Sequence, residues 1–169
     1  MLFQVFRMVV AALLAVSGLV PVVLRADPPD QYAFHAYDQG LTRAAASNKP
    51  VFLYFGREGC GYCDLTNKKG FADPAVRQGY QEHYELVYVD SESGRRLRLP
   101  SGERITEREL GVRFRAFVTP VFVFMQPDGT PILKRVGVQS ADQLLQYHRY
   151  VSEGHYRRLS FEQFSADNG

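Results

Sequence analysis

Apolar residues gather in four short runs along the chain, separated by polar segments. Residues 51–55 (VFLYF) and 85–89 (ELVYV) are two such runs, and residues 118–125 (VTPVFVFM) form a third. Runs of this length that are rich in β-branched and aromatic side chains are typical of buried strands. The turn sequence Pro-Asp-Gly at 127–129 follows the third run, so residues 131–138 are predicted to return as an antiparallel fourth strand.

Helices are predicted between these strands, where capping signals interrupt the apolar pattern. Asp73-Pro74 is a helix start, and Ser/Thr-x-x-Glu/Gln capping boxes open three further segments. The predicted helices cover residues 37–48, 60–69 and 73–83, a short segment from 106, residues 140–151, and a last short segment from 160; a small hairpin is predicted over 97–105. This order predicts an α/β domain with a central mixed sheet flanked by helices.

The first 26 residues have the composition of a targeting segment. One basic residue precedes an uncharged apolar run at 8–24, and Arg25-Ala26 and a polar stretch follow it. This order predicts a signal peptide over 1–26, cleaved after Ala26. The alternative is an uncleaved membrane anchor, for which the run is short and is interrupted by Pro21. In both cases the body of the protein is expected in the periplasm or otherwise outside the cytoplasm.

Composition narrows the class of protein further. Of 169 residues, 46% are hydrophobic and 22% are charged, which excludes a wholly disordered, collagen-like or multi-span membrane protein. Residues 27–36 are predicted to be a leader and 37–169 a single domain. Without residues 1–26 the chain has 20 − 2 = 18 basic and 18 acidic residues. This neutral body does not suggest nucleic acid as a partner.

The two cysteines form the motif Cys60-Gly61-Tyr62-Cys63, which falls where a predicted strand gives way to a predicted helix. A sulfur at a helix N-terminus faces unpaired N–H groups and the positive end of the helix dipole, which stabilise a thiolate. Cys60 is therefore predicted to be the attacking sulfur and Cys63, one turn later, the resolving one. Arg57 is expected to stabilise the thiolate further, and Glu58 to oppose it.

Three other kinds of chemistry for the cysteine pair fit the sequence less well. A static disulfide would close a loop of about four residues and contribute only about 1.9 kcal/mol. A zinc site usually needs four ligands, and the sequence has no second cysteine pair. A haem attachment motif needs His directly after the second cysteine, where Asp64 stands. We therefore expect a redox pair with no metal and no cofactor.

In three of its segments the chain resembles the thioredoxin superfamily. These are VFLYFGREGCGYC at 51–63, YVD at 88–90, and LGVRFRAFVTPVFVFMQPDGTPILKRVGV at 110–138. The chain is similar to secreted bacterial thioredoxin-like proteins, including those encoded with sulfur-oxidation systems. The resemblance implies a thioredoxin-like fold and a cis peptide bond between Thr119 and Pro120 that faces the cysteines.

The resemblance also implies an activity and its partners. Thr119 and Pro120, with Gly61 and Tyr62, are expected to bind an extended substrate segment by strand addition. The expected activity is thiol–disulfide exchange with a disulfide-bearing protein or a small thiol substrate. A membrane electron donor is expected to reduce the Cys60–Cys63 disulfide again after each reaction. The chain is expected to be a monomer.

Two positions depart from the family pattern. Gly59 stands where thioredoxins carry Trp, and Tyr54 stands where they bury a proton-accepting Asp. We expect Tyr54 to be a core aromatic residue. Disulfide isomerases use a separate dimerisation domain for which this chain has no room, so we expect a reductase. The alternatives are an oxidase or isomerase of secreted proteins, and a non-catalytic binding module with a static disulfide.

A small basic insert precedes the segment that holds Pro120. Residues 95–115 contain seven Arg and three Glu, a net charge of +4. Runs of charge are usually solvated surfaces, and that is the prediction here. The alternative is a surface that docks an acidic partner or steers an anionic substrate.

Overall fold

The computed structural model describes residues 28–168, so the predicted signal peptide lies outside the described residues. Four strands form one sheet in the order β2-β1-β5-β6. They are β1 Val51–Gly56, β2 Glu85–Asp90, β5 Val121–Met125 and β6 Pro131–Val136. β1 pairs parallel with β2 and antiparallel with β5, and β5 pairs antiparallel with β6. The sheet is therefore mixed, as predicted, although the last two strands are shorter than expected.

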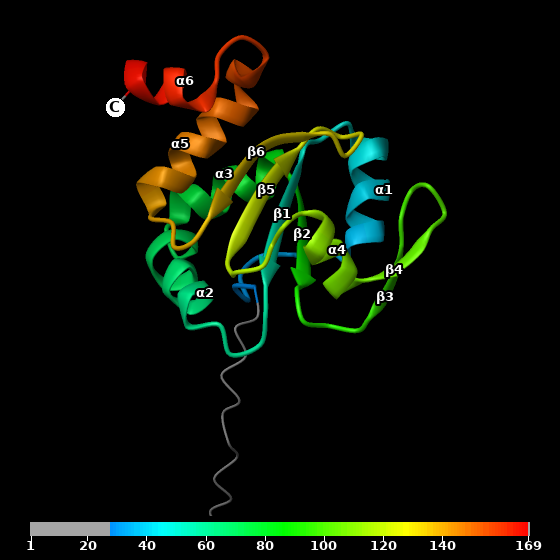
Figure 1. The fold of residues 1–169 in the computed structure, drawn as a ribbon. Coiled ribbons are helices and arrows are strands. Elements are labelled where there is room, and N and C mark those ends of the chain that lie inside the picture. The colour runs from blue at the N-terminus through cyan, green and yellow to red at the C-terminus, as the bar shows by residue number, and fades with distance from the viewer. Residues whose placement is uncertain (1–27, 169) are drawn as a thin grey trace, which may run out of the picture.

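Both faces of the sheet are covered by helices, as Figure 1 shows. α1 Tyr37–Ser47 and α4 Glu107–Arg113 lie on one face; α2 Gly61–Thr66, α3 Pro74–His83 and α5 Ala141–Ser152 lie on the other. Val51, Leu53 and Phe55 of β1 belong to the core under α1, while Phe52 and Tyr54 belong to the opposite core. Because successive strand residues point to opposite faces, this double burial explains the unbroken apolar runs.

The helix that follows the cysteines changes from an α-helix to a π-helix along its length. The predicted helix over 60–69 is an α-helix only to Thr66, and a π-helical turn, η1 Asn67–Phe71, continues it. At Gly70 an added Cβ would lie 2.7 Å from Leu144 Cδ1 and 2.9 Å from the backbone oxygen of Gln139. A glycine therefore lets this turn pack directly against the start of α5.

The basic insert folds as the predicted hairpin, β3 Arg96–Arg98 and β4 Arg104–Thr106. Its apolar side chains Leu97 and Ile105 are buried in the core under α1. Thr106 then opens α4 through the predicted capping box with Glu109.

The C-terminal helices also begin at the predicted caps. Ser140 and Gln143 form the capping box of α5, and Ser160 and Gln163 exchange the same bonds before α6 Phe161–Asn168. A 3-10 turn, η2 His155–Arg157, joins the two helices. Within residues 28–168, none of the helices combines the length and the apolar character that crossing a bilayer requires.

The described part of the predicted leader packs on the domain. Tyr32 is buried, and its hydroxyl donates to the backbone oxygen of Phe71 at 2.8 Å. His35 forms an isolated parallel bridge with Val87 of β2. This segment therefore covers part of the edge of the sheet beside β2, which would otherwise expose unpaired backbone groups.

Candidate active site

The two cysteines lie at the junction of β1 and α2, at the carboxyl end of the strand. Gly59 has a φ of 67°, a left-handed conformation that glycine adopts without steric cost, and it turns the chain into the helix. Cys60 is the N-cap of α2, and its sulfur is bonded to that of Cys63. The predicted strand-to-helix placement of the pair is confirmed.

The sulfur of Cys60 accepts two hydrogen bonds. The backbone N–H of Cys63 donates to it at 3.2 Å, and the hydroxyl of Thr119 donates to it at 3.1 Å. Both donors favour negative charge on this sulfur when the pair is reduced. Both cysteines are buried, and Cys60 is the residue that stands at the helix N-terminus. This asymmetry fits Cys60 as the attacking sulfur and Cys63 as the resolving one.

The peptide bond between Thr119 and Pro120 is cis, as the resemblance implied. It immediately precedes β5, the strand antiparallel to β1, so the Thr119 side chain meets Cys60 across the sheet end. The predicted strand over 118–125 begins only at Val121, directly after Pro120, which offers no N–H for pairing. Tyr62, between the cysteines, is 68% exposed and Gly61 is also exposed.

Arg57 and Glu58 lie outside hydrogen-bonding contact with the cysteine sulfurs. The Nε atom of Arg57 lies 3.7 Å from a carboxylate oxygen of Glu92, and its Nη1 donates to the backbone oxygen of Glu58 at 3.4 Å. The Glu58 side chain faces solvent. The expected effects of these two residues on the thiolate stay predictions, because neither side chain forms a hydrogen bond with a cysteine sulfur.

Tyr54 is a fully buried core residue, as expected. Its ring packs against those of Phe71, Tyr88 and Phe122. Its hydroxyl donates to Asn67 Oδ1 at 3.3 Å, and burial raises the pKa of this hydroxyl well above its ordinary value. Tyr54 therefore stays protonated and does not replace a buried carboxylate as proton acceptor.

A comparison with protein families decides the classification. The model of a thioredoxin-like domain matches residues 37–152. The chain belongs to the thioredoxin-like family. With its cysteine motif at the helix start, this thioredoxin-like protein is a thiol–disulfide oxidoreductase.

Solved structures share the fold. A thioredoxin-fold protein from Helicobacter pylori is 22% identical, with a TM-score of 0.61, and the match covers 72% of this chain and 80% of that one. A thioredoxin from Thermus thermophilus is 26% identical, with a TM-score of 0.59, covering 72% and 87%. The oxidoreductase DsbH is 16% identical, with a TM-score of 0.52, covering 70% and 85%. Curated proteins give no significant match to the sequence.

A buried polar network holds the helix of this thioredoxin-like site in place. The hydroxyl of Thr66, at the end of α2, donates to the backbone oxygen of Tyr62 and accepts from the N–H of Gln139. Gln139 Oε1 accepts in turn from the Tyr147 hydroxyl at 2.6 Å. Sequence reasoning missed these residues, because Thr66 and Gln139 belong to no motif and meet only in the folded chain.

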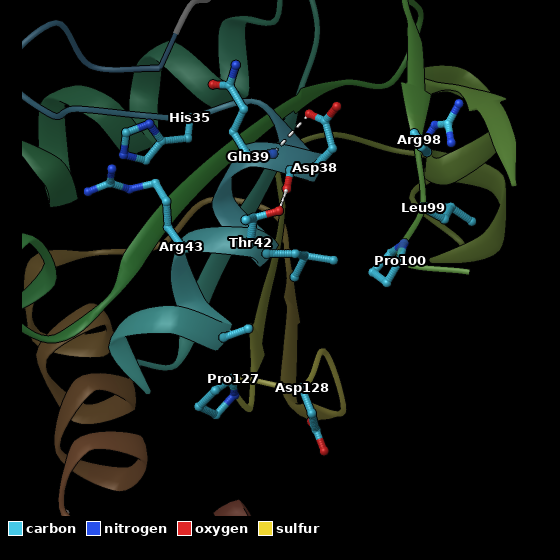
Figure 2. A pocket seen from close by; sticks show the side chains of 12 residues that line it. His35, Asp38, Gln39, Thr42, Arg43, Arg98, Leu99, Pro100, Pro127 and Asp128 are labelled. Atoms are coloured by element: carbon cyan, nitrogen blue, oxygen red, sulfur yellow. Dashed lines mark hydrogen bonds between the residues drawn. The ribbon is translucent and has the colours of Figure 1, made fainter. Parts of the chain in front are cut away.

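A cavity lies in the surface away from the cysteines. It has a volume of about 870 Å³ and opens between α1, the β3–β4 hairpin and the β5–β6 turn. Figure 2 shows Asp38 and Thr42 on one side of it, and Arg98 across from them. Neither cysteine lines this cavity, so we place the site at the sulfur pair, where the reactive chemistry lies. Among residues 28–168, no three His, Cys, Asp or Glu side chains cluster as metal ligands.

Proposed function

We propose that this thioredoxin-like protein reduces disulfides in proteins or small thiol substrates outside the cytoplasm. One observation carries the exchange chemistry of this proposal, whichever its direction: the Cys60 sulfur accepts bonds from the Cys63 N–H and the Thr119 hydroxyl, beside Pro120. These contacts prepare one sulfur of the pair as a nucleophile, and they leave the backbone before Pro120 beside it for a substrate strand.

The reaction proceeds in two exchanges. In the reduced protein, the Cys60 thiolate attacks one sulfur of the substrate disulfide, and the other substrate sulfur leaves as a thiolate that takes up a proton. The Cys63 thiol then loses its proton and attacks Cys60 in the mixed disulfide, which releases the second substrate thiol. Two electrons and two protons pass to the substrate, and the Cys60–Cys63 disulfide remains. An electron donor must then reduce this disulfide.

The extracytoplasmic location rests on the apolar segment of residues 1–26, proposed as a cleaved signal peptide. In that compartment the donor that recharges the pair would be a membrane protein that carries thiols. The domain is proposed to act as a monomer, with residues 27–36 as its leader. N-terminal sequencing of the secreted protein tests the cleavage, and a mature chain that begins at Asp27 is the expected result.

The reducing direction is supported by the likeness to a protein named thioredoxin, at 26% identity. A second candidate function, an oxidase or isomerase of secreted proteins, is favoured by the two donors to the Cys60 sulfur. Donors that stabilise the thiolate stabilise the reduced pair, and a stable reduced pair is an oxidant. The two functions differ in the reduction potential of the same sulfur pair.

Equilibration of the Cys60–Cys63 couple against thiol buffers is the test. A potential near about −270 mV is expected for a reductase, while a value of about −120 to −180 mV would establish the oxidising alternative. In the same assay series, Cys60→Ser should abolish disulfide reduction. A protein with a static disulfide, acting only as a binding module, would resist alkylation of Cys60 after mild reduction and would bind its partner equally well as Cys60→Ser.

A further inference from the structure

A second, small cavity lies directly beside the cysteine site. Its volume is about 160 Å³, and its walls come from the β1–α2 loop, the segment after β2, helix α4 and the segment before Pro120. Thr119 lines this cavity and also bonds the Cys60 sulfur at 3.1 Å. Thr119 therefore contacts both the cavity and the reacting sulfur.

The charge in this cavity is positive. Arg57, Arg108 and Glu92 line it, which sums to +1. Arg57 forms a long ion pair with the exposed Glu92 carboxylate at 3.7 Å. Arg108 donates to the backbone oxygen of Glu92 at 2.7 Å, and among residues 28–168 no carboxylate lies within ion-pair distance of its guanidinium. The Arg108 charge is therefore available to an anion that enters the cavity.

An unsatisfied hydroxyl lies in the same wall. The Oγ atom of Ser91 is buried and has no hydrogen-bond partner among the described residues. Gly111 stands opposite, where an added Cβ would lie 3.6 Å from this oxygen. A buried polar group without a partner is unfavourable, and a carboxylate in the cavity would accept the bond that Ser91 offers once the cavity wall adjusts to expose the hydroxyl.

The mouth of the cavity is apolar. Val112, Phe117 and Val118 line it and are 56%, 73% and 61% exposed. Exposed apolar side chains beside a reactive sulfur suit a peptide rather than a free inorganic anion, because they bury apolar surface of the bound chain. The volume suits one short side chain.

We propose that this cavity is a specificity subsite that takes an acidic side chain of the disulfide substrate. The inference rests on the proposed function, since it assumes that the substrate reacts at Cys60. An extended peptide advances about 3.3 Å per residue, so the acidic residue would stand one to three positions from the substrate cysteine. Ser91 and Arg108 would bind its carboxylate, and Val112, Phe117 and Val118 would contact its neighbours.

The experiment compares short peptide disulfides of neutral sequence that carry Glu, Gln or Lys at each of three positions on either side of the cysteine. The reduced full-length mature protein is the reductant, and kcat/KM is measured for each peptide. At one position, Glu is expected to exceed Gln by about tenfold, because only the Glu carboxylate carries a charge opposite to that of Arg108. Lys at that position is expected to react more slowly than Gln.

Three variants assign the preference to the cavity. Arg108→Gln should bring the ratio of kcat/KM for the Glu peptide to that for the Gln peptide close to one. Ser91→Ala should also lower this ratio, and it serves as the test if Arg108→Gln does not fold. Glu92→Gln should raise the ratio, because it removes the carboxylate that competes for Arg57. The matched control is Arg104→Gln on the exposed face of β4, which should keep the wild-type ratio.

Each contrary result has a separate meaning. Equal rates on Glu, Gln and Lys peptides at every position would overturn the subsite and leave the proposed function in place. A preference for Glu that survives in both Arg108→Gln and Ser91→Ala would overturn the assignment to this cavity. A wild-type protein that reduces none of the peptides would overturn the proposed function, and the subsite with it.

Discussion

The hydroxyl of Thr119 donates a hydrogen bond to the sulfur of Cys60 at 3.1 Å, although 59 positions separate the two residues. Thr119 and Pro120 immediately precede β5, whose first residue pairs with the end of β1. The same side chain lines the small cavity beside the site. Thr119 thus connects the reactive sulfur, the proposed substrate strand and the proposed acidic subsite.

Replacing Thr119 by Val should raise the pKa of the Cys60 thiol in the reduced protein by about one to two units. The variant keeps the shape of the side chain but removes a donor to the sulfur, and a bond to a charged group contributes about 1.5–3 kcal/mol. The rate of alkylation of the reduced protein as a function of pH measures this change. Thr119→Ser keeps the hydroxyl and should keep the wild-type pKa. An unchanged pKa in Thr119→Val would mean that the Thr119 hydroxyl does not stabilise the Cys60 thiolate in the reduced protein.

Cys63→Ser should trap the protein as a mixed disulfide with its substrate. The Cys60 sulfur accepts two hydrogen bonds that stabilise its thiolate, so we expect attack at Cys60, and the second exchange then needs the Cys63 sulfur. Intact-protein mass spectrometry after incubation with a peptide disulfide should show one added peptide on Cys63→Ser. Cys60→Ser should show none, and an equal adduct on Cys63 in that variant would reverse the assigned roles.

Gly70→Ala should destabilise the fold by about 1–3 kcal/mol, the range for overpacking of a core. The new methyl group would lie 2.7 Å from Leu144 Cδ1 and 2.9 Å from the backbone oxygen of Gln139. Chemical denaturation with a fixed m-value measures the change. The matched control is Gly94→Ala, where no atom lies within 4 Å, and its effect should stay within about 0.5 kcal/mol. Equal stability of the two variants would contradict the packing argument.

Acid should weaken the packing of α3 against α5 through His148. The centre of its half-buried ring lies 4.8 Å from that of His83 in an edge-on arrangement, and its Nδ1 lies 3.2 Å from the Tyr84 hydroxyl oxygen, within hydrogen-bonding distance. Burial lowers the pKa of His148 and the His83 imidazole lowers it further, against smaller raising effects of Glu153 and Glu82. The unfolded chain therefore binds more protons below about pH 6.5, and the free energy of unfolding should fall as pH drops from 7 towards 5.

His148→Gln tests this pH dependence. The variant should remove the part of the slope that belongs to His148, at most about 1.4 kcal/mol per pH unit. His155→Gln is the matched control, because that ring pairs with Glu153 at the surface and lies outside the contact of α3 with α5. A slope that is unchanged in His148→Gln would assign the acid sensitivity to other groups.

Arg104→Glu should stabilise the basic hairpin. Arg98 and Arg104 stand directly opposite each other on β3 and β4, both exposed, and like charges at such positions repel. An Arg–Glu pair there should add about 0.2–1 kcal/mol to the free energy of unfolding at low salt. The gain should shrink at about 1 M salt, where the screening length is about 3 Å. A loss of stability would mean that Arg104 makes favourable contacts that the register does not reveal.

Local patterns alone determined most of the secondary structure. The apolar run 51–55 became β1, and the boxes Thr106-x-x-Glu109 and Ser140-x-x-Gln143 became the N-termini of α4 and α5. These features depend on residues within one turn or one strand, so the sequence displays them directly. The placement of Cys60 at a helix start followed from the same local signals.

The family resemblance implies that Thr119 and Pro120 face the cysteines, but only the tertiary structure shows the contacts that the side chains around the site make. Thr119 contacts Cys60 because β1 and β5 pair in a fixed register, and Arg57 turns to Glu92 because that residue follows the neighbouring strand β2. The cavity of Ser91 and Arg108 forms only when α4 packs beside these strand ends. Such contacts form when burial of both sheet faces brings distant chain segments together. The residue spacing within a single segment therefore cannot predict them.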